Sequence, residues 1–280
     1  MAFKYSITLS SFRSLEGIKQ TLYRLKDQGF DAVEMYGEPD KINTNELKET
    51  LDSCGLPICG ITAMWGRSSQ DGWKRKLLSQ DQDLVRHSEN YVKKCIELCH
   101  YLGGSELNIC LFADTENNFD ANHDMISGTE KKYRLEKTVP LLVSLARFAS
   151  ERGVSLMIEP LNRYSTPYCN TVSDALYLVD KLNQDNVGIL LDTFHMNIEE
   201  YSFEKAIHDS REHLSHMHFA DNNRSMPGFA HVDFEPIVRT LQKISYDRFV
   251  SFEPNFMEYD YKSATLEGLQ HIKKIENNQS

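Results

Sequence analysis

Short apolar runs alternate with longer stretches of helical periodicity along this chain, and this alternation restricts its possible folds more than any other feature. Apolar runs bounded by turn residues are typical of buried strands, and leucines and isoleucines spaced three and four apart are typical of helices. We predict eight strands, at residues 5–9, 32–35, 58–63, 107–112, 155–159, 187–191, 214–219 and 249–253. We predict a helix after each strand, at residues 15–28, 44–53, 84–102, 130–152, 172–182, 203–210, 234–244 and 261–275.

Eight strand–helix units in one unbroken series favour a closed barrel. Several of the strands are continuous apolar runs, as expected for parallel strands that are covered on both faces. The length of 280 residues suits a (β/α)8 barrel, which commonly needs about 250 residues. We therefore predict an α/β fold, a (β/α)8 TIM barrel forming one domain over residues 1–280, with 276–280 as a frayed tail.

The charge balance argues against some partners. The chain has 31 Lys and Arg against 41 Asp and Glu, a net charge of −10. Nucleic acids and anionic membranes are bound by clustered basic residues, so we expect neither as a partner. No run approaches the roughly 20 apolar residues of a membrane helix, and the six cysteines form no CxxC pair. These features predict a cytoplasmic protein with free thiols.

Four consecutive predicted strands carry a potential metal ligand at or near their carboxyl ends, where the active site of such a barrel lies. These residues are Glu159, Asp192, His218 and Glu253. Carboxylates that end apolar runs are costly to bury unless they are paired or metal-bound, and three of them together would repel each other. A divalent ion resolves both problems. One imidazole and three carboxylates favour Mn²⁺, Mg²⁺ or Co²⁺ over structural zinc. We expect Mn²⁺, with Mg²⁺, Co²⁺ or Zn²⁺ as alternatives.

Further polar side chains follow the same strands. Asn162 comes after the fifth strand, His195 lies three residues beyond Asp192, and Arg224 lies six residues beyond His218. Such groups beside a metal suit a substrate rich in hydroxyl or carbonyl groups. We expect His216 to point to the opposite face of its strand from His218.

Several motifs are similar to those of a known family. They are E-P-L-N-R-Y at 159–164, D-T-F-H-M-N at 192–197, H-x5-R at 218–224, P-G-x-x-H-x-D at 227–233, and Glu253. With these motifs the chain resembles the xylose-isomerase-like barrel superfamily (sugar phosphate isomerases and epimerases), and within it the ketose 3-epimerase group typified by D-tagatose 3-epimerase. The resemblance covers nearly the whole chain. The group carries a second Glu two residues after the Arg of the N-R motif, where this chain has Ser165.

The resemblance implies roles for individual residues. Glu159, Asp192, His218 and Glu253 would bind the metal, and Glu159 and Glu253 would also be the catalytic acid–base pair. His195, Arg224, Asn162 and Ser165 would contact the substrate. The resemblance also implies a homodimer or homotetramer.

We predict a metal-dependent sugar isomerase or epimerase. It would act on a ketose or a related keto-polyol through a metal-stabilised enediolate, with proton transfer by two Glu residues. A dehydratase or lyase of the same superfamily, of the inosose or dehydroshikimate type, could use the same ligands. A metal-dependent endonuclease, which would need more histidines and a basic groove, and a non-catalytic sugar-binding barrel are more distant alternatives.

Overall fold

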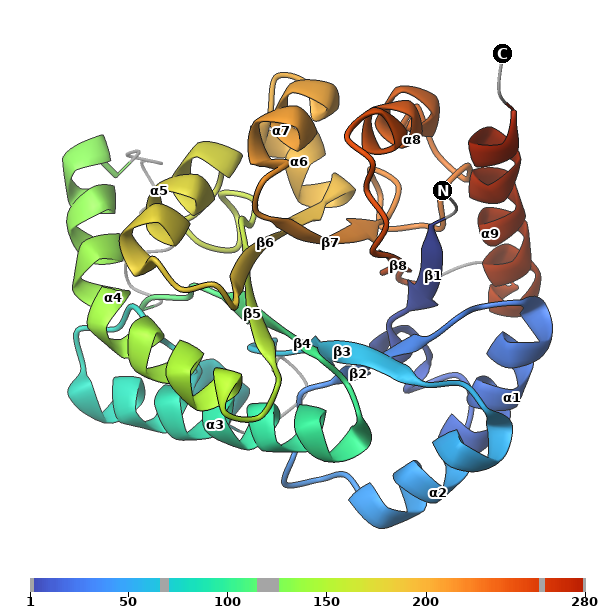
Figure 1. The fold of residues 1–280 in the computed structure, drawn as a ribbon, viewed down its shortest axis with the longest axis horizontal. Coiled ribbons are helices and arrows are strands. Elements are labelled where there is room, and N and C mark those ends of the chain that lie inside the picture. Colours follow the sequence, from blue (N-terminus) through green and yellow to red (C-terminus); the bar gives the residue numbers. More distant parts are fainter. Residues whose placement is uncertain (1–2, 66–70, 115–125, 257–259, 279–280) are drawn as a thin grey trace.

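The eight strands form one parallel sheet that curves into a barrel (Figure 1). The computed structural model describes residues 3–65, 71–114, 126–256 and 260–278. The strands are β1 (Lys4–Ile7), β2 (Val33–Tyr36), β3 (Ile58–Thr62), β4 (Glu106–Cys110), β5 (Ser155–Glu159), β6 (Val187–Asp192), β7 (Leu214–Phe219) and β8 (Phe249–Phe252). Each strand pairs with the next, β1 pairs with β8, and an isolated parallel bridge between Thr8 and Glu34 joins β1 to β2. The predicted (β/α)8 barrel is confirmed.

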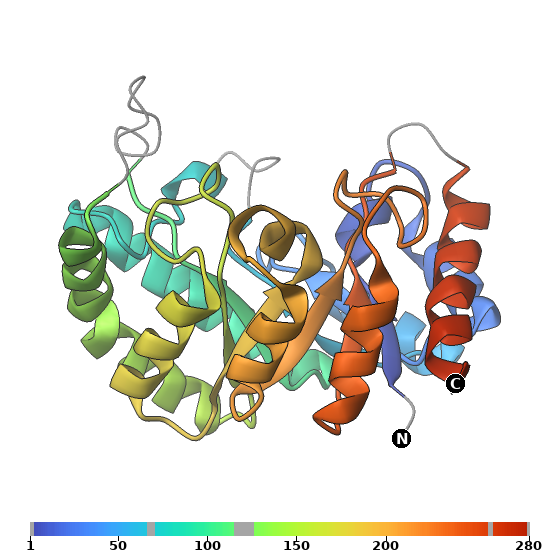
Figure 2. The same ribbon diagram turned by 90° about the horizontal axis from the view of Figure 1, so that it is seen from above.

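Helices surround the strands on the outside (Figure 1). They are α1 (Ile18–Gln28), α2 (Thr44–Cys54), α3 (Gln82–Leu102), α4 (Gly128–Ser150), α5 (Val172–Leu182), α6 (Thr193–Glu199), α7 (Phe203–Ser210), α8 (Phe234–Lys243) and α9 (Tyr261–Asn277). Two short 3₁₀ helices, η1 (Leu9–Phe12) and η2 (Gly72–Lys74), follow β1 and β3. In the view turned by 90°, across the barrel axis, the outer helices run beside the strands (Figure 2). Among the described residues, no helix is long and apolar enough to cross a membrane.

Local sequence signals explain most helix boundaries. At α5, the Thr171 side chain accepts from the Asp174 N–H while Asp174 caps in return, a capping box that begins the helix as predicted. At α1, Gly29 adopts a left-handed φ of 89° and ends the helix. At α2, the cap is Asn43, the residue just before the predicted helix. Its backbone dihedrals are extended and its side chain accepts from the Glu46 N–H.

Several element bounds differ from prediction by one to three residues, and the helix α6 was not predicted. Helix α1 begins at Ile18, three residues later than expected, and α6 stands where we expected a loop. At the carboxyl end, α9 continues to Asn277 because the carboxylate of Glu276 is buried and accepts hydrogen bonds from the Phe3 N–H and the Tyr5 hydroxyl, both at 2.7 Å. The predicted fraying from residue 276 is therefore wrong for Glu276, and residues 279–280 lie outside the described part of the chain.

Candidate metal centre

The four predicted ligands lie together at the carboxyl ends of neighbouring strands. Glu159 ends β5, Asp192 ends β6 and sits opposite His218 of β7 in the sheet register, and Glu253 directly follows β8. One ligand atom from each lies within 4.8 Å of all the others. Ligands on opposite sides of an ion with bonds of about 2.1 Å are about 4.2 Å apart, so a small movement would close this cluster around one cation.

Two buried atoms in the cluster lack a hydrogen-bond partner. They are Oε1 of Glu159 and Nδ1 of His218. A buried polar atom without a partner is costly, and native proteins satisfy nearly all of them with protein, water or an ion. Both atoms belong to residues of the cluster, and carboxylate oxygens with one imidazole suit a hard divalent cation. The donor set therefore fits the metal expected from the sequence.

The carboxylates titrate differently because their surroundings differ. Burial, together with the charges of Glu253 and Asp192, raises the pKa of Glu159 to about 7. Burial also raises the pKa of Asp192. Burial acts in the same direction on Glu253, but the cations Arg224 and His218 outweigh it and lower the pKa of Glu253 to about 2. The cluster thus contains one carboxyl group that changes protonation near neutral pH.

Arg224 is the cation that balances this acidic cluster. Its Nη1 lies 2.6 Å from Oδ2 of Asp192 and 2.9 Å from Oε2 of Glu253. The residue has a left-handed φ of 65°, in a turn closed by the hydrogen bond from its N–H to the Asp221 carbonyl. Its guanidinium also stacks over the Phe194 ring at 4.3 Å. The side chain is thereby held over the carboxylates, in reach of anything bound at them.

His195 lies on α6, which Asp192 caps by accepting from the Phe194 N–H at 2.8 Å. The backbone N–H of Asn162 donates to Nδ1 of His195 at 3.1 Å, which favours the tautomer with the proton on Nε2, and Nη2 of Arg224 lies 3.3 Å from Nε2. Nε2 lies 3.8 Å from Oε1 of Glu159 and 3.7 Å from Oδ2 of Asp192. Burial and the charge of Arg224 hold the pKa of His195 well below its usual value. His195 is therefore a neutral hydrogen-bond donor facing the cluster.

A cavity of about 450 Å³ opens above these groups. It is lined by Ser10, Ser11, Trp65, Asn162, Tyr164, Ser165, Phe194, His195, Ile198, Arg224, Glu253, Pro254 and Asn255. All four predicted substrate-contact residues are among them. Ser165 donates to Oδ1 of Asn162 at 3.3 Å, whereas the neighbouring Arg163 turns away and pairs with Glu199 at 2.9 Å.

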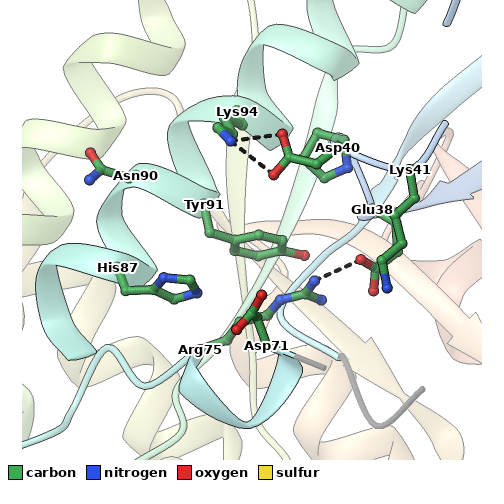
Figure 3. Close-up of a pocket in the computed structure, with 10 residues that line it drawn as sticks. Glu38, Asp40, Lys41, Asp71, Arg75, His87, Asn90, Tyr91 and Lys94 are labelled. Carbon is green, nitrogen blue, oxygen red and sulfur yellow. Dashed lines mark hydrogen bonds and ion pairs between the residues drawn. The ribbon is translucent and has the colours of Figure 1, made fainter. Parts of the chain in front are cut away.

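A second hollow of about 370 Å³ lies beside α3 (Figure 3). Within it Lys94 pairs with Asp40 at 2.7 Å, and Arg75 pairs with Glu38 at 2.9 Å. Arg75 also donates to the carbonyl of Trp65 at 2.9 Å. Because the Trp65 indole lies parallel to the His195 ring, the Glu38–Arg75 pair supports one side of the candidate site.

Three functional candidates escaped the sequence analysis: Glu34, Glu106 and His216. Our expectation that His216 faces away from His218 is wrong. Residues two apart on a strand share a face, and the two rings are 5.2 Å apart. The alternation H-M-H at 216–218 was the available signal for His216. Glu34 and Glu106 are each the one acidic residue in an apolar strand, and no sequence signal marked them as functional.

A family model described as a xylose isomerase-like TIM barrel matches residues 22–275. The chain belongs to this family. Among its relatives, 3-dehydro-D-guloside 4-epimerase of Escherichia coli (strain K12) is 27% identical over 268 residues, which cover 92% of this chain and 95% of the relative. Ketose 3-epimerase of Arthrobacter globiformis is 30% identical over 246 residues, covering 85% of this chain and 78% of the relative.

Solved structures of this barrel family superpose over almost the whole chain. A structure of L-ribulose 3-epimerase has a TM-score of 0.84 at 21% identity and covers 98% of this chain and 95% of its own. The apo form of 3-keto-D-glucoside 4-epimerase from E. coli has a TM-score of 0.83 at 24% identity, covering 98% and 100%. These structures establish the shared fold. The curated relatives, which are named sugar epimerases, place the chain in the isomerase class that its motifs predicted.

Proposed function

We propose that this chain is a divalent-metal-dependent epimerase of keto-sugars in which Glu159 and Glu253 transfer the proton. The observation that carries the proposal is the convergence of Glu159, Asp192, His218 and Glu253 within 4.8 Å at the carboxyl end of the barrel. Named sugar epimerases that match over most of the chain support the reaction class.

The two glutamates enter the site from separate strands. A divalent ion held there supplies Lewis-acid polarisation of a substrate carbonyl and its neighbouring hydroxyl, which acidifies the C–H between them. Glu159 comes from β5 and Glu253 from the end of β8, three strands apart round the ring. One carboxylate removes the proton and the other delivers a proton to the opposite face, which inverts that carbon.

The remaining groups bind and orient the sugar. Arg224 offers guanidinium N–H donors to a substrate oxygen, and His195 offers its Nε2–H. Asn162 keeps the His195 ring in this tautomer through the 3.1 Å hydrogen bond to Nδ1. Both donors are buried against carboxylates, so they are oriented before substrate arrives, which reduces the entropy lost on binding.

A cyclic keto-glycoside is a second candidate substrate, beside a free ketose. Ser165 replaces the acid that the ketose 3-epimerase group carries at this position. A Ser hydroxyl forms weaker hydrogen bonds with a sugar than a carboxylate does. The neighbouring Tyr164 is 58% exposed at the cavity of about 450 Å³. One relative that matches nearly end to end is named as an epimerase of a dehydro-guloside. A less acidic cavity with an exposed tyrosine at its edge suits a sugar that carries an aglycone.

We propose further that the ion is Mn²⁺, that the protein is a single-domain homodimer or homotetramer, and that it is cytoplasmic. The six cysteines, all buried and free in the structure, support a reducing compartment.

The test is to incubate the Mn²⁺-loaded protein with ketoses, 3-keto-glycosides and keto-polyols in D₂O. We expect one substrate class to gain deuterium at a single carbon and to yield its epimer, as seen by NMR. A dehydrated product would instead favour the lyase. The absence of both exchange and product across the panel, with metal bound, would contradict the proposal.

The variants Glu159→Gln and Glu253→Gln test the two-base mechanism. Each retains a ligating oxygen but loses its basicity, so we expect turnover to fall about 10²- to 10⁴-fold. One variant should still exchange the substrate C–H with D₂O from the face whose base remains. Bound Mn²⁺ is measured in parallel, and near-normal turnover of both variants would refute the mechanism.

A further inference from the structure

A chain of four buried side chains lies beneath the metal centre. Nδ1 of His216 is 2.8 Å from Oε2 of Glu106. Nε2 of His216 lies 3.4 Å from Oε1 of Glu34, and neither of these two atoms has a hydrogen-bond partner. The other oxygen of Glu34, Oε2, is 2.9 Å from Nε2 of His218. The order is therefore Glu106, His216, Glu34, His218. The side chains of Glu34 and both histidines are fully buried.

Glu34 meets His218 on the side away from the proposed metal. Oε2 of Glu34 accepts a hydrogen bond from Nε2–H of His218 and another from the Ser251 hydroxyl at 2.6 Å. Nδ1, the other ring nitrogen of His218, lies 3.3 Å from Oε2 of Glu253 and has no good hydrogen bond. A carboxylate can only accept, so its bond to Nε2 leaves Nδ1 as the nitrogen that faces the cluster.

We propose that Glu34 is a positioning residue for the metal centre. Its carboxylate fixes the His218 ring with Nδ1 toward Glu159, Asp192 and Glu253, and the hydroxyl of Ser251 fixes Glu34 in turn. This inference rests on the proposed metal-dependent function. A carboxylate on the outer nitrogen of a ligating histidine orients the ring and makes the inner nitrogen a better donor.

The topology explains why Glu34 is available for this role. Glu34 is on β2, at the closure of the barrel, where it forms the bridge with Thr8, the residue that follows β1. His216 and His218 are on β7, across the barrel interior from β2. Glu34 has no close Lys or Arg partner among the ion pairs of the described residues, and its contacts with ionisable groups there are to the two imidazoles. A buried carboxylate held in this way gives the His218 ring a single defined orientation.

The rival explanation is a second metal ion held by Glu34, His216 and His218, whose ligand atoms also lie within 4.8 Å of each other. That site would need Nε2 of His218, the nitrogen that Glu34 engages. It would also use Oε1 of Glu34 and Nε2 of His216, which lie 3.4 Å apart and have no hydrogen-bond partner. The number of ions bound per chain separates the two explanations.

The experiment compares the wild-type chain with Glu34→Gln, using Mn²⁺ as the probe. Glutamine keeps the size of the side chain and removes the charge. We expect one Mn²⁺ per wild-type chain and an affinity about 10- to 100-fold lower in the variant, measured by calorimetric titration. In the Mg²⁺-loaded wild type, ¹⁵N NMR should show His218 protonated at Nε2 and not at Nδ1.

Two further variants keep the test decisive. Ser251→Ala removes only the hydroxyl bond to Glu34 and should weaken Mn²⁺ binding less than Glu34→Gln does, so it serves even if Glu34→Gln fails to fold. Glu276→Gln, which changes another buried carboxylate whose hydrogen bonds are to Phe3 and Tyr5, should leave the Mn²⁺ affinity unchanged.

The possible outcomes separate the two proposals. Wild-type Mn²⁺ affinity in Glu34→Gln and Ser251→Ala would overturn the positioning role alone. Two ions per wild-type chain, falling to one in Glu34→Gln, would overturn it in favour of the second metal site. A wild-type chain that binds no divalent ion would overturn the proposed function, and the positioning role with it.

Discussion

At the scale of single residues, the candidate site is an acidic cluster in which neighbouring groups and burial give the carboxyl groups different pKa values. Glu253, beside Arg224 and His218, has its pKa lowered to about 2, whereas Glu159 has its pKa raised to about 7 by burial and by its acidic neighbours. Such separation is typical of functional carboxylates. It makes ligand binding depend on pH.

Metal binding should release protons, because ligands bind in their deprotonated forms. The pKa of His218 is raised well above its usual value, since Glu34 and Glu253 outweigh the effect of burial, so Nδ1 must lose a proton over the neutral range. Below pH 7 Glu159 must lose one as well. We expect Mn²⁺ affinity to fall as pH falls, with about one proton released above pH 7 and about two below it.

Calorimetry in buffers of different ionisation enthalpy measures this release. The variant Glu159→Gln should lose the additional proton below pH 7 and keep the one from His218. An affinity that does not change between pH 6 and pH 8 would contradict the assignment.

Arg224→Ala should separate substrate binding from metal binding. The guanidinium lies 2.6 Å and 2.9 Å from carboxylates of Asp192 and Glu253, so its loss removes a positive charge that competes with the cation. We expect Mn²⁺ affinity to stay the same or rise, while kcat/KM falls about 10- to 100-fold through the lost charged hydrogen bonds. Loss of bound Mn²⁺ in this variant would instead mark Arg224 as a support for the ligands.

At the scale of elements, the short helix α6 joins the metal centre to the substrate pocket. Asp192 ends β6 and caps α6 by accepting from the Phe194 N–H, and His195 is in the first turn of that helix. Asp192 is therefore a proposed metal ligand, and it also caps the helix that orients His195, a proposed substrate contact.

The cap can be tested by comparing Asp192→Asn with Asp192→Ala in the metal-free protein. Both remove the charge, but only asparagine keeps an oxygen that can accept from the Phe194 N–H. We expect the alanine variant to have a free energy of unfolding lower by about 1 kcal/mol. Urea unfolding in the presence of a chelator measures the difference, and equal stabilities would show that the cap contributes nothing.

At the scale of the whole molecule, the barrel closes where the two ends of the chain meet. Strand β1 pairs with β8, and Glu276 near the end of α9 accepts hydrogen bonds from Phe3 and Tyr5 at the start of the chain. The last helix therefore holds the first strand in the barrel. By holding this strand, it also holds Thr8 in its bridge with Glu34.

Glu276→Ala should destabilise the fold without touching the candidate site. It removes two hydrogen bonds to a charged acceptor and leaves the Phe3 N–H and the Tyr5 hydroxyl unpaired. We expect a loss of about 2–4 kcal/mol in the free energy of unfolding, measured by urea titration. The exposed Glu267 of the same helix gives the control Glu267→Ala, which should stay within about 0.5 kcal/mol of wild type. A similar loss in both would refute the role of Glu276.

Local patterns in the amino-acid sequence were enough to predict the barrel and the rim on which the ligand candidates lie. Strand and helix periodicity is a local property, and in a barrel the carboxyl end of each strand reaches the same face. That is why 172–182, 203–210 and 214–219 were predicted with the bounds that the structure has. It is also why Glu159, Asp192, His218 and Glu253 could be chosen together.

The side chains that support that rim could be identified only from the packed strands. Glu34 and His218 are 184 residues apart, Glu106 and His216 are 110 apart, and Glu276 and Phe3 are 273 apart. Hydrogen bonds over such separations depend on barrel closure and on strand register, which no local pattern contains. Periodicity shows that a residue points inward, but the partner that neutralises a buried charge is known only once the strands are packed together.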